Sequence, residues 1–319
     1  MAALTPGDAR GLIPAAFAAR MASGMPAAAA WVEALPGLVA DVLRRWHLEP
    51  DGDPLTGYTA LVLPVRDADG VLRAVKFSFV EDDNVGEIPT MKLWGGRGAA
   101  ELVRADPRRG VLLLEWLGEP LEEWWDADEA TRAVAALYRD LHRPAAPQLP
   151  DGHALVRGWL RDLERLGRRA PAPPRFVEWA LRAGRELTAA PGSHVIHGDL
   201  HYLNVLRRGD GWAAIDPKGY NADPCLEVVP LLWNRWEDLE ASGDVGEAIR
   251  DRFYAVVDTA GLDERRARDW VVVRCMINVA WQAEPGAPAG AGLDSAQEWL
   301  TRNITLASAM QAIEVADPL

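Results

Sequence analysis

The hydrophobic pattern of this chain changes near residue 117 from the two-residue period of strands to the period of helices, and this change most constrains the fold. Before it, apolar segments at 61–66 and 71–79 flank a turn that ends in Asp-Gly, which is typical of a β-hairpin. The apolar run 111–116 adds a further strand. Beyond residue 121 most apolar residues recur at helical spacing. The sequence therefore predicts an α+β protein with a small β-rich lobe and a large, mainly helical lobe.

The chain has 319 residues, which is enough for two domains. A linker near 117–121 predicts an N-terminal lobe over 1–118 and a C-terminal lobe over 119–319. The alanine-rich segment 1–30 allows two interpretations, a weakly amphipathic helical arm that packs on the N-terminal lobe or a frayed arm.

Charge and hydropathy exclude several classes of partner. The 47 acidic residues outnumber the 34 basic ones, which gives a formal net charge of −13. Nucleic-acid binding needs clustered lysine and arginine, so we expect no nucleic-acid partner. No apolar segment approaches the ~20 residues of a membrane span, and the N-terminus makes a poor signal peptide. We therefore expect a cytoplasmic protein that does not bind membranes and that favours cationic partners.

Side chains suited to catalysis and metal binding are concentrated in the segment HGDLHYLN at 197–204 and in the aspartate that follows it after a predicted hairpin. Asp199 and Asn204 are five residues apart, and Asp216 lies twelve residues beyond Asn204. This is the spacing of a kinase catalytic loop followed by a metal-binding aspartate. In such a loop Asp199 orients the attacking hydroxyl and accepts its proton, while Asn204 and Asp216 supply oxygen ligands for Mg²⁺.

A competing interpretation uses the same segment to bind a catalytic metal ion. Alternate residues of a strand share a face, so His197, Asp199 and His201 could together bind a metal ion for hydrolysis. This interpretation leaves Asn204 and Asp216 without a role, which favours the kinase-like one.

Motifs along most of the chain resemble those of a known family. The segments HGDLHYLNVL, AIDPKGYNADP and PLLWN, with LRAVKF and KLWGGRGAAELV upstream, resemble the aminoglycoside/hydroxyurea antibiotic resistance kinases. The resemblance covers roughly residues 31–300. It implies a protein-kinase-like bilobal fold, ATP and Mg²⁺ as cofactors, and transfer of the γ-phosphate to a hydroxyl of a small molecule.

The resemblance also implies a class of acceptor, which is a hydroxylated and cationic small molecule of the aminoglycoside kind. Two alternatives stay open on the same fold. One is a metabolic sugar or amino-sugar kinase. The other is a nucleotide-binding pseudokinase or interaction protein, against which the complete Asp199, Asn204 and Asp216 set argues.

The same resemblance assigns the nucleotide-binding residues. Asp199 corresponds to the catalytic base, and Lys76 to the lysine that binds the α- and β-phosphates. Glu87 stands where the family has the acid that pairs with this lysine. Because Ile88-Pro89 follows and disfavours a continuous helix, Glu87 is equally well interpreted as a surface-loop acid.

Further nucleotide contacts follow from position in the motif order. The backbone around Glu115 and Leu117 corresponds to the segment that binds the adenine edge. Thr56 and Gly57 correspond to the glycine-rich loop, although neither GxGxxG nor GxxxxGK is present. The absence of a GxxxxGK motif argues against a Walker-type fold.

Acidic residues dominate the part of the helical lobe where an acceptor is expected to bind. Residues 221–247 contain seven acidic side chains and one basic side chain, and residues 281–319 contain five acidic side chains and one basic one. We expect the acceptor to contact Asp223, Glu227, Trp281 and Glu284. The alternatives are that Asp223 and Glu227 cap and brace the following helix, and that the tryptophan belongs to the core.

Overall fold

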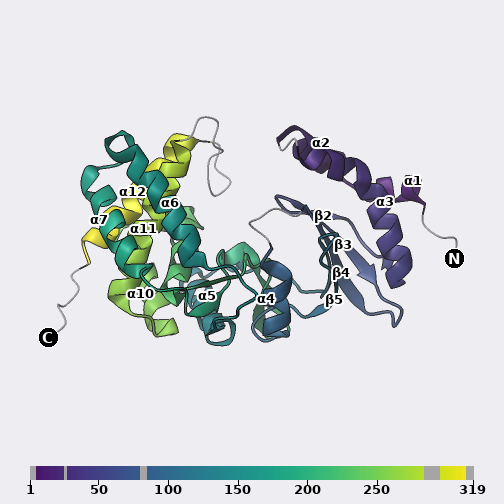
Figure 1. Cartoon of the computed structure of the whole chain (residues 1–319). Coiled ribbons are helices and arrows are strands. Elements are labelled where there is room, and N and C mark those ends of the chain that lie inside the picture. Colours follow the sequence, from purple (N-terminus) through teal and green to yellow (C-terminus); the bar gives the residue numbers. More distant parts are fainter. Residues whose placement is uncertain (1–4, 25–26, 80–84, 284–294, 314–319) are drawn as a thin grey trace. The chain divides into compact units, whose positions relative to one another are not determined.

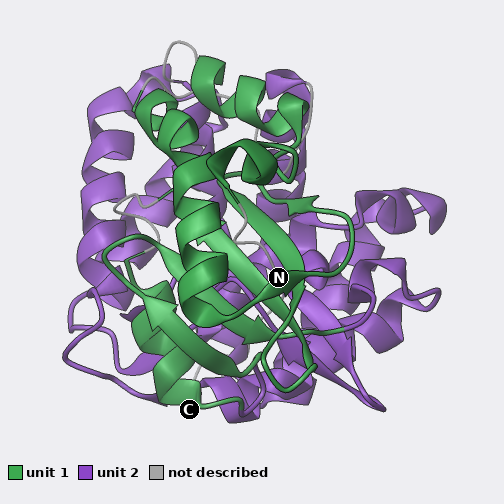
Figure 2. Cartoon of the chain, turned by 90° about the vertical axis from the view of Figure 1, so that its right-hand side faces the viewer, with its two compact units in different colours: residues 1–96, 100–117 green, residues 97–99, 118–319 purple. Residues whose placement is uncertain are grey.

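The computed structural model describes residues 5–24, 27–79, 85–283 and 295–313 (Figure 1). The chain divides into two compact units, residues 1–96 with 100–117 and residues 97–99 with 118–319 (Figure 2). The first unit holds a six-stranded sheet, and most of the helices belong to the second. Among the described residues, none of the helices combines the length and apolar character that a membrane crossing requires.

The sheet of the first unit is antiparallel, with the strand order β1-β3-β4-β6-β5 and β2 paired to β3. The predicted hairpin is confirmed, because β3 and β4 pair from Ala60↔Ser78 to Arg66↔Leu72. Its turn is stabilised by Asp67, whose Oδ1 accepts hydrogen bonds from the backbone of residues 69 and 71. The strands are β1 Glu49–Pro50, β2 Leu55–Thr56, β3 Ala60–Arg66, β4 Leu72–Ser78, β5 Leu102–Asp106 and β6 Val111–Glu115.

The N-terminal segment packs on this sheet and is not a frayed arm. It forms α1 (Pro6–Arg10), α2 (Ala15–Gly24) and α3 (Ala28–Trp46), and Figure 1 shows α2 and α3 beside the strands. The buried side chains of Phe17 and Leu35 belong to one core cluster with those of Val75 and Phe77 from β4. Removal of this apolar surface from water holds the helices on the sheet.

The second unit is mainly helical, with two small sheets. One sheet is the β9–β10 hairpin, and the other has the order β11-β8-β7. Its helices are α5 Ala127–Leu141, α6 Gly152–Leu166, α7 Pro174–Leu187, α8 Val228–Trp233, α9 Trp236–Ala241, α10 Val245–Ala260, α11 Glu264–Gln282 and α12 Ala296–Gln311. Its strands are β7 Arg143–Pro144, β8 His194–Ile196, β9 Val205–Arg208, β10 Gly211–Ala214 and β11 Tyr220–Ala222.

In the loop between α7 and β8, the backbone at Gly192 lies very close to that of Asn221 in β11. A Cβ added at Gly192 would lie 2.0 Å from the backbone oxygen of Asn221, which is closer than any real contact. The Asn221 side chain in turn accepts from the backbone N–H of Ala146 and donates to its carbonyl oxygen, at 2.9 and 2.8 Å. Glycine is therefore required at position 192 by the space available.

We expect Gly192→Ala to reduce the free energy of unfolding by about 2 kcal/mol or more, because the methyl group forces the backbone strands apart. Gly158→Ala in α6 is the matched control, because its Cβ would meet only the end of a flexible arginine at 3.7 Å. Alanine is the better helix former, so the control should gain about 0.5–1 kcal/mol. Urea unfolding of the full chain measures both, and equal stability of the two variants would contradict the close approach.

Candidate active site

Backbone hydrogen bonds join the segment 197–204 to the segment that follows the β9–β10 hairpin. The N–H of Ile215 donates to the carbonyl of Asn204 at 2.9 Å, and the N–H of Lys218 donates to the carbonyl of His197 at 2.9 Å. The hairpin pairs Val205 with Ala214, so the chain returns directly beside Asn204. These contacts bring the predicted base and both predicted metal ligands together in the second unit.

The Asp199 side chain lies half-buried at the start of the loop. Its carboxylate accepts no hydrogen bond from the described residues, while its backbone N–H donates to Nδ1 of His197 at 3.2 Å. Burial raises the pKa of the Asp199 carboxyl above its usual value. The nearby basic side chains that oppose this rise are His201, Lys218 and Arg274. An unengaged carboxylate with a raised pKa is suited to accept a proton.

The Asn204 side chain is oriented by the protein. Its Nδ2 donates to the backbone carbonyl of Asp199 at 2.9 Å. A carbonyl oxygen only accepts, so the nitrogen end of the amide must face it and Oδ1 is directed the other way. The amide carbonyl of Asn204 is therefore presented as an oxygen ligand.

Asp216 is exposed and has a left-handed backbone conformation, with φ 60°. This backbone conformation is unfavourable for residues other than glycine, although aspartate tolerates it better than most. Strain of this kind persists only where the surrounding structure holds it, and it is common at functional sites. The donor set of Asp216 and Asn204 fits Mg²⁺, which prefers oxygen ligands and completes its coordination in kinases with nucleotide phosphates.

His197 holds the loop and is not available to a metal ion. Its Nε2 donates to the carbonyl of Ile215 at 2.8 Å, and its Nδ1 accepts from the backbone of Asp199. The ring is fully buried, and burial lowers the pKa of His197 to about 4. In the described part of the chain, no group of three or more histidine, cysteine, aspartate or glutamate residues could hold a metal ion. The geometry therefore does not support the hydrolase interpretation.

Glu227 stabilises the same loop by accepting hydrogen bonds from its backbone. Its Oε1 accepts from the N–H of Gly198 at 2.7 Å and its Oε2 from that of His197 at 3.3 Å, and the residue is 1% exposed. Burial raises the pKa of Glu227 to about 7, although both N–H donors favour the charged form. These contacts commit Glu227 to the protein and not to an acceptor, but it braces the loop at 197–198 and not, as the sequence alternative predicts, the helix that follows it.

Asp223 is also committed to the protein. Its Oδ1 caps the short helix at 224–227 by accepting from the N–H of Cys225 at 3.0 Å. Its Oδ2 accepts from Nε of Arg266 at 3.0 Å, and the residue is buried. For Asp223 the structure thus favours the second sequence interpretation, namely capping rather than acceptor binding.

Trp281 lies in an aromatic cluster at the end of α11. Its ring meets that of Trp159 edge-on at 5.0 Å, and the Arg274 guanidinium lies 4.5 Å from its centroid. Arg274 is one of the basic groups whose charge opposes the burial-driven rise in the pKa of Asp199. Glu284, the fourth predicted acceptor residue, lies outside the described residues.

Lys76 and Glu87 form a buried ion pair in the first unit. Nζ of Lys76 lies 2.6 Å from Oε1 of Glu87, and the residues are 7% and 3% exposed. The predicted conflict with Pro89 does not arise, because α4 (Glu87–Trp94) begins at Glu87. Proline in the first turn lacks only an N–H that has no helical partner there. The interpretation of Glu87 as a surface-loop acid is therefore wrong.

The other predicted nucleotide residues lie at strand ends of the first unit. Thr56 ends β2 and Gly57 follows it in the turn, where its N–H donates to Ala60 at 2.9 Å. Glu115 ends β6, and its N–H donates to Glu101 at 3.0 Å. The backbone of Leu117 makes no hydrogen bond to the described residues, which leaves its polar groups for a ligand.

The turn after β2 has a contact that no sequence signal revealed. The Arg20 guanidinium in α2 donates to the carbonyl of Gly57 at 2.8 Å and to that of Tyr58 at 2.6 Å. Arg20 and Gly57 are 37 residues apart in the sequence, so no local sequence pattern indicates their contact. The contact follows only from the packing of α2 on the sheet.

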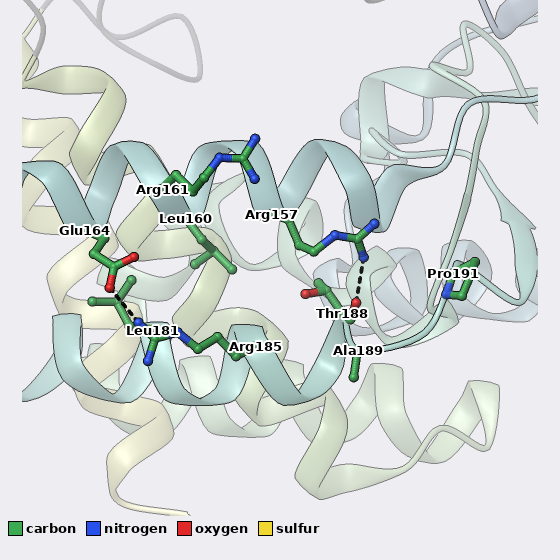
Figure 3. A pocket seen from close by; sticks show the side chains of 9 residues that line it. All are labelled: Arg157, Leu160, Arg161, Glu164, Leu181, Arg185, Thr188, Ala189 and Pro191. Carbon is green, nitrogen blue, oxygen red and sulfur yellow. Dashed lines mark hydrogen bonds and ion pairs between the residues drawn. The ribbon is translucent and has the colours of Figure 1, made fainter.

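A cavity of about 370 Å³ lies between α6 and α7 (Figure 3). Two of its three arginines are engaged with protein oxygens: Arg157 donates to the carbonyl of Thr188, and Arg185 pairs with Glu164, each at 2.6 Å. None of its nine lining residues belongs to 197–204 or 215–219. The cavity is therefore a seam between two helices and not part of the candidate active site.

Glu227→Gln tests the brace, because it places an NH₂ group against one backbone N–H. We expect a loss of about 1–3 kcal/mol in the free energy of unfolding near neutral pH. The loss should grow as the pH falls from about 7 toward 4.5, because wild-type Glu227 has a raised pKa and takes up a proton on folding. Glutamine does not titrate, so it lacks this gain.

Urea unfolding at about pH 5 and about pH 8 measures this difference. Glu178→Gln in α7 is the control, since Glu178 is exposed and should change stability little at either pH. A stability difference that is the same at both pH values would show that Glu227 does not titrate in this range.

The Lys76–Glu87 pair can be tested by removing one charge and then both. Lys76→Met leaves Glu87 buried without this partner, which we expect to cost about 3–5 kcal/mol. Lys76→Met/Glu87→Leu should recover most of that loss, because an apolar pair replaces the ion pair. Chemical unfolding measures both variants, with Lys92→Met as the exposed control. A double variant no more stable than the single one would refute the pairing.

Residues 45–286 match the aminoglycoside/hydroxyurea antibiotic resistance kinase family. The chain is 35% identical over 291 residues to a streptomycin 6-kinase of Streptomyces glaucescens, with 88% of this chain and 91% of that protein covered. It is 38% identical over 267 residues to a hydroxyurea phosphotransferase of Kitasatospora aureofaciens, with 81% and 76% covered.

A solved structure of spectinomycin phosphotransferase with ADP and spectinomycin resembles the fold. The TM-score is 0.56 at 12% sequence identity, and the match covers 85% of this chain and 96% of that one. The predicted protein-kinase-like fold, with a β-rich first part and a mainly helical second part, is confirmed.

Proposed function

Because the chain belongs to the aminoglycoside/hydroxyurea antibiotic resistance kinase family, we propose that it uses ATP and Mg²⁺ to phosphorylate a hydroxyl of an aminoglycoside-type antibiotic. The observation that carries the proposal is the unengaged carboxylate of Asp199 beside the oriented Asn204 amide. Phosphoryl transfer depends on positioning and electrostatics, and these are what the braced loop supplies.

Each residue has a defined part in the proposed reaction. Asp199 would accept the proton of the acceptor hydroxyl as the hydroxyl oxygen bonds to the γ-phosphorus and the bond from that phosphorus to ADP breaks. Asn204 and Asp216 would hold Mg²⁺, which neutralises charge on the phosphate oxygens when bound. Lys76, fixed by Glu87, would bind the α- and β-phosphates, and the Leu117 backbone the adenine edge.

The proposed acceptor is cationic, on the strength of the net charge of −13 and of the relatives named for streptomycin. The Arg274 charge opposes the rise in the pKa of Asp199 that burial causes, so a second cation at that point is unfavourable. The acceptor therefore presents a hydroxyl to Asp199 and keeps its own cationic groups at a distance. Trp281, beside Arg274, is the proposed aromatic wall of the acceptor site.

The proposal predicts that the purified protein with ATP and Mg²⁺ adds one phosphoryl group to streptomycin, detected by mass spectrometry. Asp199→Asn should lower kcat at least ~10²-fold while ADP affinity stays within about three-fold, because only the proton acceptor is lost. Acceptor KM should rise with salt, because screening weakens attraction of a cation.

Two controls define the outcome. Hydroxyurea tests the small, neutral acceptor named for the relative that is 38% identical. Efficient turnover of hydroxyurea or of a neutral sugar, with no turnover of streptomycin, would refute the aminoglycoside class. Near wild-type kcat in Asp199→Asn would remove Asp199 from the mechanism.

A further inference from the structure

The imidazole ring of His201 has one hydrogen-bond partner in the described structure, and it is the Asn204 amide. Nδ2 of Asn204 lies 3.3 Å from Nε2 of His201 and also donates to the carbonyl of Asp199 at 2.9 Å. The carbonyl fixes the nitrogen end of the amide at this position. Because an amide nitrogen only donates, Nε2 of His201 must be the unprotonated acceptor.

This contact determines the tautomer of the neutral ring, since a neutral imidazole carries its proton on the nitrogen that does not accept. The proton of His201 is therefore on Nδ1. That atom is buried and has no hydrogen-bond partner among the described residues. A buried donor without a partner lowers stability, so the ring is not explained by a contribution to folding.

We propose that His201 is a positioning residue that holds the Asn204 amide so that Oδ1 faces the cation bound with the nucleotide. The two hydrogens of Nδ2 go to Asp199 and His201, which leaves one rotamer and one orientation for the amide. Outer groups that orient a metal ligand commonly change metal affinity about 10–100-fold when removed. This inference rests on the proposed function, because it takes Asn204 as a Mg²⁺ ligand.

The arrangement also argues against His201 as a ligand itself. Its Nε2 is occupied by an amide hydrogen, and its Nδ1 is buried. His197, the other histidine of the segment, has both ring nitrogens bonded to backbone groups. The histidines thus act on the loop and leave the cation to oxygen ligands.

Two substitutions separate the positioning role from a general loss of packing. In His201→Gln the side-chain oxygen can occupy the place of Nε2 and accept from Asn204. In His201→Asn the shorter side chain places its amide near Nδ1 and cannot reach Asn204. His201→Ala removes both. His194→Ala is the matched control, because the only polar contact of that ring in the described structure is with Ser193.

The test is calorimetric binding of ADP to the full-length variants at increasing Mg²⁺ concentration. We expect His201→Ala and His201→Asn to weaken apparent Mg²⁺ affinity by about 10-fold or more, and His201→Gln by less than about three-fold. ADP binding without Mg²⁺ and the thermal midpoint should change little. A uniform loss in all three variants, or no loss in any of them, would overturn the proposal.

A second readout needs no metal or nucleotide. Nitrogen-15 NMR of the imidazole in the free protein should show His201 protonated on Nδ1, and an Nε2-protonated neutral ring would refute the contact. Asn204→Ala separates the two claims. If it leaves Mg²⁺ affinity unchanged, the metal role in the proposed function fails; if it weakens affinity while His201→Ala does not, this inference fails.

Discussion

The hydrogen bonds from the catalytic loop to the Glu227 carboxylate are the interaction on which the site depends. The N–H groups of Gly198 and His197 donate to separate oxygens, at 2.7 and 3.3 Å. Burying a carboxylate is unfavourable, and this raises the pKa of Glu227 to about 7. Two backbone donors offset part of the cost. The result is a fixed backbone immediately before Asp199, which positions the proposed proton acceptor before any ligand binds.

The same principle recurs in both units. In the second unit, backbone bonds from Ile215 and Lys218 return the hairpin to the loop, so that Asp216, the proposed metal ligand, is held on strained backbone. In the first, the sheet buries Lys76 against Glu87, which fixes a cation that solvent would otherwise leave mobile. In each unit the protein itself fixes part of the proposed site, through a side-chain partner for Lys76 and through backbone hydrogen bonds around Asp199 and Asp216, as preorganised catalysis requires.

Local sequence patterns predicted the elements that depend on local chemistry. The Asp-Gly turn predicted the hairpin at 60–78. The spacing of Asp199, Asn204 and Asp216 within one short segment predicted the candidate site. Contacts that depend on packing could not be predicted from the sequence. Two aspartates, Asp126 and Asp128, lie at the start of α5, and it is the Asp126 carboxylate that accepts from the N–H of Glu129.

The roles of Glu227 and His201 escaped prediction for a related reason. An acid-rich segment does not reveal which carboxylates are buried, so Glu227 was equally compatible with an acceptor site and with a brace. His201 reaches Asn204 across a tight turn that has no pattern of its own. Burial and side-chain direction decide both cases, and neither is encoded in spacing alone.

Amide hydrogen exchange at Gly198 tests the central claim most directly, because it reports the hydrogen bond between the loop and Glu227. The account predicts that this amide exchanges as slowly as those of the buried strand β8 in the wild type, without any ligand. It also predicts that Glu227→Gln selectively loses protection at one of the two amides, Gly198 or His197, namely the one that the NH₂ group faces. Exchange at the rate of an exposed loop amide in the wild type would contradict a braced and preorganised catalytic loop.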